Sequence, residues 1–555
     1  MSRLPLSLLL VLAICPYFVD LGGSSIWDAN EAFYVETPRE MIERGDYINP
    51  TFNYEPRQNK PVLSYWIVAG FYKAFGVSPG VQRVPIAIGG LALIATAFFL
   101  ARAAAPAALA RDAAWWAALG LAISPRLLMF ARRIFIDIYI SMFMALTLLF
   151  FALAEGHPQR RRLFLTLMYV SVGLGVLTKG PIAILLPGLA FAGYLLAHRE
   201  LGRIKEMLVP LGTIVVLAIV VPWYAAIYHQ WGWGPIKSFL FGENVARYVD
   251  GVGVGADRPV WWYLPVVFSD SFPWSLFLVP AAILWFRERR AASLDPTHRF
   301  RTLLWIWIAV IVGFFSLSAG KQDLYIYPIV PAVVALAGIV IAGALAKPSA
   351  VPNMPGVTTV AALIGFVLFI AGIAFYVLFH SSYAIYLLAG SGVIGVTAAV
   401  AGVAASTLAV RGRIAGALVV TASALVVLNW IFVRQVLPSF EAYKPAPRLA
   451  EVLKARAAPD DLIVTYNVAL PSLVYYLRRH TEVFYDHGPV LELLASSRPL
   501  YLLVTADDYE RAIQPNAPHP LCRVSAQPTF DVKLRNVLSR ARVPQILLLT
   551  NKCGR

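Results

Sequence analysis

Charged side chains are scarce in this sequence. Asp, Glu, Lys and Arg make up 14% of its 555 residues, hydrophobic residues make up 59%, and the mean hydropathy is +0.67. Soluble domains carry about 25% charged residues, so a single water-facing globule is excluded. The apolar residues form runs such as Leu324–Ala346 and Val360–Phe379, and a bilayer core about 30 Å thick needs roughly 20 of them per helix. The sequence therefore predicts an all-α polytopic membrane protein.

Cysteine is also rare, with three residues in the chain. Cys15 falls inside the first apolar run and is interpreted as an inert residue that packs against its neighbours. Cys522 and Cys553 lie in a polar C-terminal region and could pair if that region is extracytoplasmic. No cluster of Cys and His has the spacing of a structural zinc site. We expect no metal and no cofactor, although a divalent cation is possible.

A long basic stretch is absent too, despite the net charge of +16. Lys and Arg occur in short clusters between the apolar runs, without the interleaved aromatics of a nucleic-acid surface. No glycine-rich phosphate loop follows a strand and opens a helix. We therefore expect membrane lipids, and not nucleic acid, as surroundings of this chain.

The apolar runs predict about thirteen membrane-spanning helices. The candidates are Leu4–Val19 and the segments near 83–101, 114–125, 134–154, 163–178, 181–197, 208–228, 263–286, 302–319, 324–346, 357–379, 384–408 and 414–433. The first is interpreted as an uncleaved helix, because no clear small-residue cleavage site follows it.

The cations between the runs predict the orientation. If the N-terminus is cytoplasmic, alternate loops are cytoplasmic, and nearly all of them carry the excess of Lys and Arg that the positive-inside rule requires. These residues are Arg102, Arg111, Arg160, Arg161, Arg162, Arg199, Arg203, Lys205, Arg287, Arg289, Arg290, Arg299, Arg301, Arg411 and Arg413. An odd number of spans then places the C-terminal region outside the cytoplasm.

Two domains are predicted. Residues 1–434 form the transmembrane domain, in which 20–82 is a long first outer loop with interfacial helices. Residues 435–555 form a small extracytoplasmic α/β domain, because short apolar or β-branched runs alternate there with helical segments. The expected strands are Leu462–Tyr466, Glu482–Tyr485, Leu500–Thr505 and Gln545–Thr550, and the expected helices are Pro471–Arg479 and Val490–Ala495.

Several ionisable residues remain on the outer side, against the usual orientation signal. Cations that converge on one cavity would bind an anionic headgroup through charge-assisted hydrogen bonds, and nearby acids would suit a hydroxyl nucleophile. Each residue also has a plainer interpretation: Lys60, Lys179 and Lys321 as snorkelling side chains, and Asp28 and Glu31 as solvated loop acids. Asp137 needs a partner or an aqueous cavity, because a charge at membrane depth costs about 3 kcal/mol.

These outer segments, in this order, resemble the bacterial aminoarabinose transferases of lipid A and the related protein O-mannosyltransferases. Both groups are membrane glycosyltransferases with the C-type fold. The resemblance covers roughly residues 1–335. Its motifs are WDANEAFY at 27–34, PREM at 38–41, NKP at 59–61, Asp137, LTKG at 177–180, Arg247, WYLP at 262–265 and the stretch from Lys321 through Tyr325 to Pro328.

The resemblance implies an inverting transfer of an aminoarabinose-like pentose or a hexose from a polyprenyl-phosphate donor, in the bacterial inner membrane with a periplasmic active site. It assigns the donor phosphate to Lys60, Arg247, Tyr325 and Lys321, catalysis to Glu31, Asp28 and Asp137, and substrate contacts to Asn30, Tyr34, Lys179 and Arg132. Asn30 stands where the family has an aspartate, and Asn59 replaces a second acid. An amide cannot act as a base, so the first-loop role passes to Glu31 or Asp28, or to Asp137.

The expected acceptor is lipid A or lipopolysaccharide, with another envelope glycan, lipid or protein as alternatives. Two other classes of protein compete with a transferase. A lipid or sugar-lipid transporter is expected to have inverted repeats and charged residues near the membrane midplane. No internal repeat stands out in this sequence. A non-catalytic scaffold would use the outer domain to bind partners.

Overall fold

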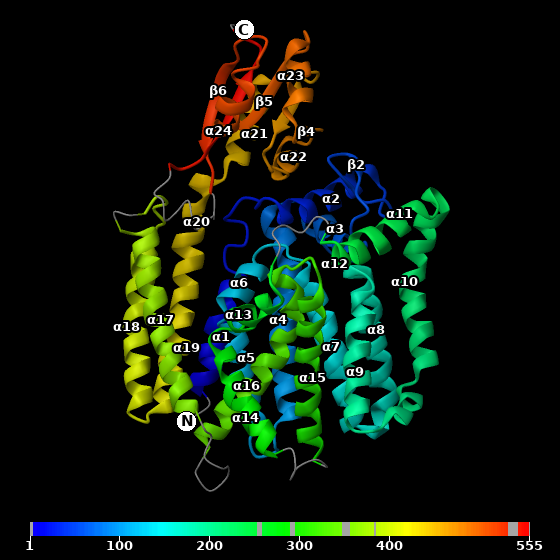
Figure 1. Cartoon of the computed structure of the whole chain (residues 1–555), viewed down its shortest axis with the longest axis vertical. Coiled ribbons are helices and arrows are strands. Elements are labelled where there is room, and N and C mark those ends of the chain that lie inside the picture. Colours follow the sequence, from blue (N-terminus) through cyan, green and yellow to red (C-terminus); the bar gives the residue numbers. More distant parts are fainter. Residues whose placement is uncertain are drawn as a thin grey trace.

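The computed structural model describes residues 4–251, 258–288, 295–346, 356–381, 384–530 and 542–553. A bundle of helices lies beneath a smaller domain that contains the C-terminus (Figure 1). The N-terminus lies near the opposite end of the bundle. Two of the predicted cytoplasmic cations, Arg289 and Arg290, lie outside the described residues.

In the described part of the chain, nine helical segments are long and apolar enough to cross a membrane. Their main helices are α4 (Pro79–Ala104), α7 (Asp137–Gly156), α8 (Arg161–Lys179), α10 (Val209–Trp231), α15 (Pro296–Leu317), α16 (Val330–Leu345), α17 (Val357–Phe379), α18 (Ser391–Val410) and α19 (Ile414–Ile431). Two bent pairs raise the number to eleven, and α1 (Leu4–Ile14) and α9 (Ile182–Ala197) belong to shorter apolar helices. The polytopic helical fold is confirmed, whereas thirteen spans stay a prediction.

The centre of the bundle is α16, in which every residue from Val330 to Gly343 is buried. A helix that is apolar on all sides lies either in a protein core or in a membrane, and α16 lies in the core of the bundle. By contrast, α17 and α18 keep large apolar side chains exposed, including Phe366 and Val400. Such a surface suits a lipid environment, where apolar side chains face hydrocarbon.

One predicted span is bent in the structure, and another is followed by a bend. Helix α5 (Ala110–Ala122) meets α6 (Pro125–Ala131) at an angle of 61°. The second bend, of 111°, separates the segment 260–270, which includes α13 (Tyr263–Asp270), from the segment 274–288, which includes α14 (Leu278–Glu288). The continuous span predicted near 263–286 is therefore corrected to two helices. Pro273 lies at the break, where it cannot supply a backbone donor to continue the helix. The next residue, Trp274, is fully buried and donates to the Trp116 carbonyl of α5 at 2.9 Å.

The labelled elements of the first loop lie at the end of the bundle that faces the C-terminal domain (Figure 1). We call this the domain end. It carries α2 (Asn30–Arg44), the two-stranded hairpin of β1 (Thr51–Phe52) and β2 (Glu55–Pro56), and α3 (Leu63–Phe75). The short helices α11 (Gly234–Lys237) and α12 (Arg247–Val249) lie at the same end.

The C-terminal domain is built on a five-stranded sheet in the order β4-β3-β5-β7-β6. Its strands are β3 (Leu462–Tyr466), β4 (Glu482–Phe484), β5 (Leu500–Thr505), β6 (Cys522–Pro528) and β7 (Gln545–Thr550). Strands β4, β3 and β5 are parallel to one another, and β7 is antiparallel to both of its neighbours, β5 and β6. Helices α21 (Pro445–Arg456), α22 (Ser472–Leu477) and α23 (His487–Ala495) accompany them. Strand β6 was not among the predicted strands.

A disulfide joins Cys522, the first residue of β6, to Cys553 beyond β7. The two cysteines considered as a pair in the sequence are therefore bonded in the structure. The predicted division at residue 434 falls within a single turn of π-helix, η8 (Phe432–Val436), that continues directly from α19. That boundary stays a prediction.

The first loop and the C-terminal domain are joined by side-chain hydrogen bonds. The Asn53 amide donates to the Thr481 carbonyl at 2.8 Å and accepts from the Thr481 N–H at 2.9 Å. The Ser472 N–H and hydroxyl both donate to the Asp28 carboxylate at 2.7 Å. The Ile26 N–H donates to the Tyr476 hydroxyl at 2.8 Å. These bonds hold the loop against the domain at separate points.

Replacing Asn53 with glycine is expected to weaken this contact. The backbone φ of Asn53 is +59°, which glycine adopts readily, so the change removes the amide without adding strain. It leaves the buried Thr481 backbone groups unpaired, at a cost of about 1–3 kcal/mol. Thermal unfolding and limited proteolysis should both show a looser domain. Asn467→Gly, at φ +50° in an exposed turn, is the matched control, and equal behaviour of the two variants would contradict the expectation.

Candidate functional site

A cavity of about 590 Å³ lies at the domain end of the bundle. Its walls come from α2, α7, the α8–α9 junction, the π-helix η4 (Ser238–Ala246), α15 and the 3-10 helix η7 (Asp323–Ile329). The polar lining residues are Asn30, Tyr34, Arg57, Asn59, Lys60, Asp137, Lys179, Glu243, Asn244, Arg247, Tyr248, Ser318, Gln322 and Tyr325. Segments far apart in the sequence thus contribute to one space.

A carboxylate lies between two cations in this cavity. Glu243 Oε2 is 3.3 Å from Lys60 Nζ and 3.0 Å from an Arg247 Nη. Burial lowers the pKa of Lys60 to about 8; Glu243 opposes this shift, whereas the nearby Arg247 and Lys179 add to it. The cluster is therefore cationic, and its ammonium group titrates close to physiological pH.

A second ion pair lines the same cavity. Lys179, the last residue of α8, pairs with Asp137, the first residue of α7. The carboxylate is thus placed at a helix N-terminus, where the helix dipole favours negative charge. Lys179 Nζ also lies 5.0 Å from the centre of the Tyr325 ring. Asp137 thereby has both the partner and the cavity that a charge at membrane depth requires.

The remaining lining is apolar. Leu240 of η4 and Phe315 of α15 contribute to it, with Ile182 and Leu185 of α9. Leu185 is 44% exposed, so this wall continues onto the outer surface of the bundle. A cavity with cations at one end and an apolar wall that reaches the lipid-facing surface suits an amphiphile with an anionic head.

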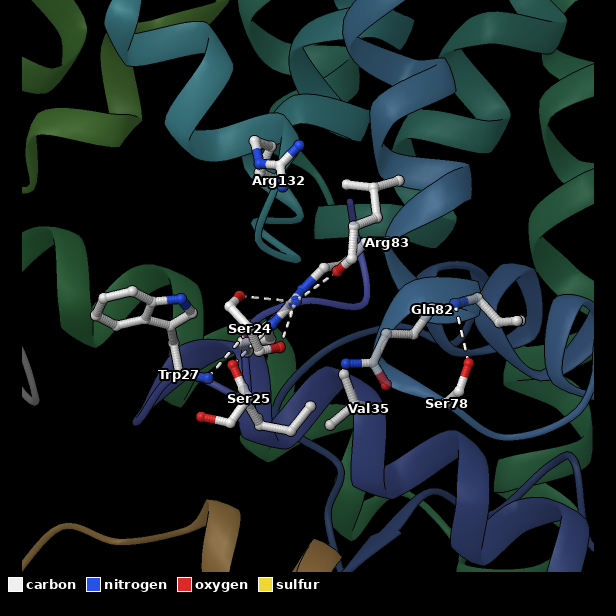
Figure 2. Close-up of polar contacts among 12 residues, drawn as sticks. Ser24, Ser25, Trp27, Val35, Ser78, Gln82, Arg83 and Arg132 are labelled. Atoms are coloured by element: carbon white, nitrogen blue, oxygen red, sulfur yellow. Dashed lines mark hydrogen bonds and ion pairs between the residues drawn. The ribbon is translucent and has the colours of Figure 1, made fainter. Parts of the chain in front are cut away.

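Glu31 is placed outside the cavity lining. Its carboxylate makes two bonds with the Arg83 guanidinium of α4, at 2.7 and 2.9 Å, and both side chains are 1% exposed. Arg83 also donates to the carbonyl groups of Leu21, Ser24 and Ser25 and to the Ser24 hydroxyl at 2.8–3.0 Å. Figure 2 shows these contacts, with Arg83 pointing toward the two serines. The surroundings of Glu31 are those of a structural ion pair.

Three other predicted site residues are not among the residues that line the cavity. Asp28 binds Ser472 of the C-terminal domain, and Lys321 donates to the Ser318 carbonyl at 2.6 Å. Arg132 donates to the carbonyls of the turn after α1, namely Pro16 at 2.6 Å, Val19 at 2.7 Å and Asp20 at 2.9 Å. Their proposed roles, and that of Glu31, stay predictions without support from the cavity geometry.

The cavity does bring together seven of the predicted site residues: Asn30, Tyr34, Lys60, Asp137, Lys179, Arg247 and Tyr325. Of the three acids predicted as catalytic, Asp137 alone is among the lining residues. Two further charged residues of the cavity, Glu243 and Arg57, belong to the outer segments but were given no role in the predicted site. Glu243 precedes Arg247 by four residues, the spacing at which opposite charges meet on a helix, and this signal could have revealed it.

No three His, Cys, Asp or Glu side chains converge on a possible metal site within the described ranges. The carboxylates that line the cavity, Asp137 and Glu243, are each bonded to lysine or arginine. These donors do not fit a divalent cation, which prefers several free oxygen ligands. That no metal takes part stays a prediction.

The bundle, the C-terminal sheet domain and the cationic cavity define a multi-pass membrane protein with the C-type glycosyltransferase fold. ArnT from Cupriavidus metallidurans bound to undecaprenyl phosphate has a similar structure, with a TM-score of 0.77, 22% identity and coverage of 100% of this chain and 99% of that chain. The apo form of the same protein gives a TM-score of 0.74. The predicted fold is confirmed by these likenesses.

Sequence relatives agree with the structural likeness. Residues 59–225 match the family of dolichyl-phosphate-mannose-protein mannosyltransferases. The undecaprenyl phosphate-alpha-4-amino-4-deoxy-L-arabinose arabinosyl transferase 1 of Pseudomonas fluorescens is 28% identical over 331 residues, which are 58% of this chain and 55% of the relative. Its counterpart in Pseudomonas aeruginosa PAO1 is 30% identical over 58% of this chain and 57% of the relative. The resemblance to aminoarabinose transferases is confirmed, although the chain matches only about half the length of these relatives.

Comparing Glu31→Gln with Asp137→Asn should separate a structural acid from a cavity acid. Glu31→Gln leaves the Arg83 charge buried without a counter-charge, so we expect a loss of about 3 kcal/mol in stability. Asp137→Asn leaves Lys179 beside the cavity, where it can be solvated, and should therefore cost less than Glu31→Gln. Thermal unfolding in detergent measures both. A Glu31→Gln protein as stable as the parent would contradict the structural role.

Proposed function

We propose that the protein is an inverting glycosyltransferase that moves an aminoarabinose-like pentose or a hexose from a polyprenyl-phosphate carrier to an envelope acceptor. The acceptor that the resemblance favours is lipid A or lipopolysaccharide. One observation carries the proposal: Lys60 and Arg247 converge beside the Asp137–Lys179 pair, in a cavity whose apolar wall reaches the lipid-facing surface. The relatives named as undecaprenyl-phosphate arabinosyl transferases support it.

The donor phosphate would bind where the Glu243 carboxylate now lies. Both are anions, and Lys60 and Arg247 present their donors to that point. When the sugar leaves, the phosphate gains a negative charge, and fixed cations stabilise this charge in the transition state. Tyr325 and Lys179 lie on the neighbouring wall, within reach of the same group.

Inversion requires the acceptor to approach the sugar from the side opposite the phosphate. Asn30 and Tyr34 of α2 line the cavity and offer an amide and a hydroxyl to the sugar. Asp137 is the acid best placed to orient the acceptor or to stabilise positive charge on the ring. Its carboxylate is already bonded to Lys179, an arrangement that suits an acceptor that is itself anionic.

The proposed orientation places the domain end in the periplasm of a bacterial inner membrane. The cations of the predicted cytoplasmic loops support it. Arg203 pairs with Glu155 at 2.6 Å, and Arg301 pairs with Glu288 at 2.7 Å. These loops lie away from the C-terminal domain and near the end of the bundle where the N-terminus lies. The disulfide of the C-terminal domain suits an oxidising compartment.

A protein O-mannosyltransferase is the second candidate. The family match over 59–225 favours it, because the family's name describes transfer from a lipid-phosphate-mannose to protein. The two candidates share the donor site and differ in the acceptor. A lipid or sugar-lipid transporter is a third possibility, from another class, and would need no transferred sugar on any product.

Mass spectrometry of cells with and without the gene tests the transfer. Lipid A, envelope glycans and exported proteins are compared, and we expect one sugar-bearing species to disappear from one of the three. Loss from lipid A supports the first candidate, and loss from proteins supports the second. Unchanged products together with a lost lipid-linked transport activity would overturn the transferase proposal.

The affinity for undecaprenyl phosphate should depend on the protonation of Lys60. Because the pKa of Lys60 is lowered to about 8, its ammonium group is lost above that pH, whereas bound phosphate would hold the proton. We expect affinity to fall by about tenfold between pH 7.5 and 9.5. Lys60→Arg keeps its charge over this range and is the control. A parallel fall in both proteins would contradict the assignment.

Replacing Glu243 with glutamine should strengthen the same binding. The carboxylate competes with phosphate for Lys60 and Arg247, and the neutral amide competes less. Near pH 7 we expect an affinity several-fold higher than that of the parent protein, measured by isothermal titration in detergent. Glu55→Gln, in the exposed β2 strand, should have no effect. Weaker binding to the Glu243 variant would show that the carboxylate positions the cations.

A further inference from the structure

Arg57 differs from the other cations of the cavity. Lys60, Lys179 and Arg247 each pair with a carboxylate. Arg57 forms no ion pair with any carboxylate in the part of the chain that the structure describes, although it lines the same cavity. A positive charge kept at a partly buried position without a counter-charge has an energetic cost. Such a group is expected where a ligand supplies the missing charge.

The position of the guanidinium is set by packing. Its central carbon lies 3.9 Å from the centre of the Phe33 ring and 5.8 Å from that of Phe52. The Nε atom is buried and makes no hydrogen bond with the described residues. Stacking on aromatic rings fixes the plane of an arginine and leaves its edge to bind an anion. The planar edge matches two oxygens of a phosphate or a carboxylate.

Tyr34 lies near both Arg57 and Glu243 in the cavity. Its ring stacks on Tyr65, with 5.5 Å between the ring centres. Burial raises the pKa of Tyr34 well above its usual range, Arg57 opposes this rise, and Asp137 and Glu243 add to it. The Tyr34 hydroxyl thus experiences Arg57 as well as the acids of the donor cluster. The cavity therefore has a second cationic point, Arg57, in addition to the cations bonded to Glu243, and Tyr34 lies near both.

The cavity lacks an unpaired carboxylate among its described lining residues. Asp137 is bonded to Lys179, and Glu243 is bonded to Lys60 and Arg247. Asn30 carries an amide, and Glu31 is bonded to Arg83 away from the cavity. A neutral hydroxyl acceptor would need a base to take its proton. An acceptor oxygen that is already anionic needs none.

We propose that Arg57, stacked on Phe33, is the subsite for the anionic acceptor group, a phosphomonoester. This rests on the proposed function, which already favours lipid A as the acceptor, and adds the residue that binds its anionic group. An oxygen of the acceptor phosphate forms the new bond to the anomeric carbon, and the bond from that carbon to the donor phosphate oxygen breaks. The electron pair stays on the donor phosphate, which gains the charge that the acceptor loses. No proton is transferred in this exchange.

Native mass spectrometry of the full-length protein in detergent, saturated with undecaprenyl phosphate, tests the subsite. The probe is dioctanoyl phosphatidic acid, a lipid phosphomonoester, and dioctanoylglycerol is the same lipid without the phosphate. We expect the parent protein to bind one further equivalent of phosphatidic acid and no dioctanoylglycerol. Inorganic phosphate as a competitor tells a free phosphate from a lipid headgroup, since only a free-phosphate site would be emptied at equal concentration.

Arg57→Gln should weaken the second binding event at least tenfold and change undecaprenyl phosphate affinity less than twofold. Arg57→Lys keeps the charge without the planar edge, so its affinity for phosphatidic acid should lie between those of the parent protein and Arg57→Gln. Arg44→Gln is the matched control, because Arg44 bonds Thr51 in the same loop but does not line the cavity. Melting temperatures show whether each variant is folded.

Three results would overturn the subsite: unchanged phosphatidic acid binding to Arg57→Gln, an equal loss of both ligands, or equal binding of dioctanoylglycerol. Should undecaprenyl phosphate not bind the parent protein at all, the proposed function fails. The comparison of Arg57→Gln with the parent protein, using phosphatidic acid alone, then still decides whether Arg57 binds a phosphomonoester.

Discussion

The buried ion pair between Arg83 and Glu31 is the interaction on which the cavity depends. Arg83 extends from α4 of the bundle, and Glu31 lies in the first turn of α2. Taking both charges out of water is costly, and the two bonds between them, with those to the Leu21, Ser24 and Ser25 carbonyls, offset that cost. The pair therefore fixes where α2 begins. It also fixes which residues of that helix reach the cavity.

The opposite side of the first loop is held by the C-terminal domain. The Trp27 ring lies between two cations, 3.6 Å from Arg133 of the bundle and 3.8 Å from Lys444 at the start of the domain. Asp28, the next residue, binds Ser472 of α22. The first loop is thus bonded to the helical bundle through Arg83 and to the C-terminal domain through Ser472. This explains how a segment without long helices can form an ordered wall of a membrane cavity.

The sequence predicted the fold class well, because apolar run length is a direct consequence of bilayer thickness. It predicted the site less completely, and α2 shows why. Asn30 and Tyr34 are four residues apart and share one face of the helix, which lines the cavity. Glu31 is one residue further on, about 100° around the axis, and faces Arg83 instead. A motif aligned by position does not distinguish these faces, whereas the helical period does.

Long-range partners were beyond a reading of the sequence. Glu31 and Arg83 are 52 residues apart, and Lys60 and Glu243 are 183 apart. Nothing local marks either pair, because both depend on how distant helices pack. The break at Pro273 was missed for a similar reason: hydropathy averages over a window and does not register a single absent N–H. Proline within an apolar run was the available signal.

The net charge of the cavity lining relates its cations and carboxylates to the reaction. Four cations and two carboxylates line it, so the described lining carries two positive charges in excess. In the proposed transfer the donor phosphate gains the negative charge that the acceptor loses, so the total charge in the cavity stays constant and the new charge develops beside Lys60 and Arg247. Binding of this kind favours the transition state over the ground state, as catalysis requires. The ion pairs of Glu243 and Asp137 keep the excess at this value, since unpaired lysines in the same space would repel one another and lose their protons.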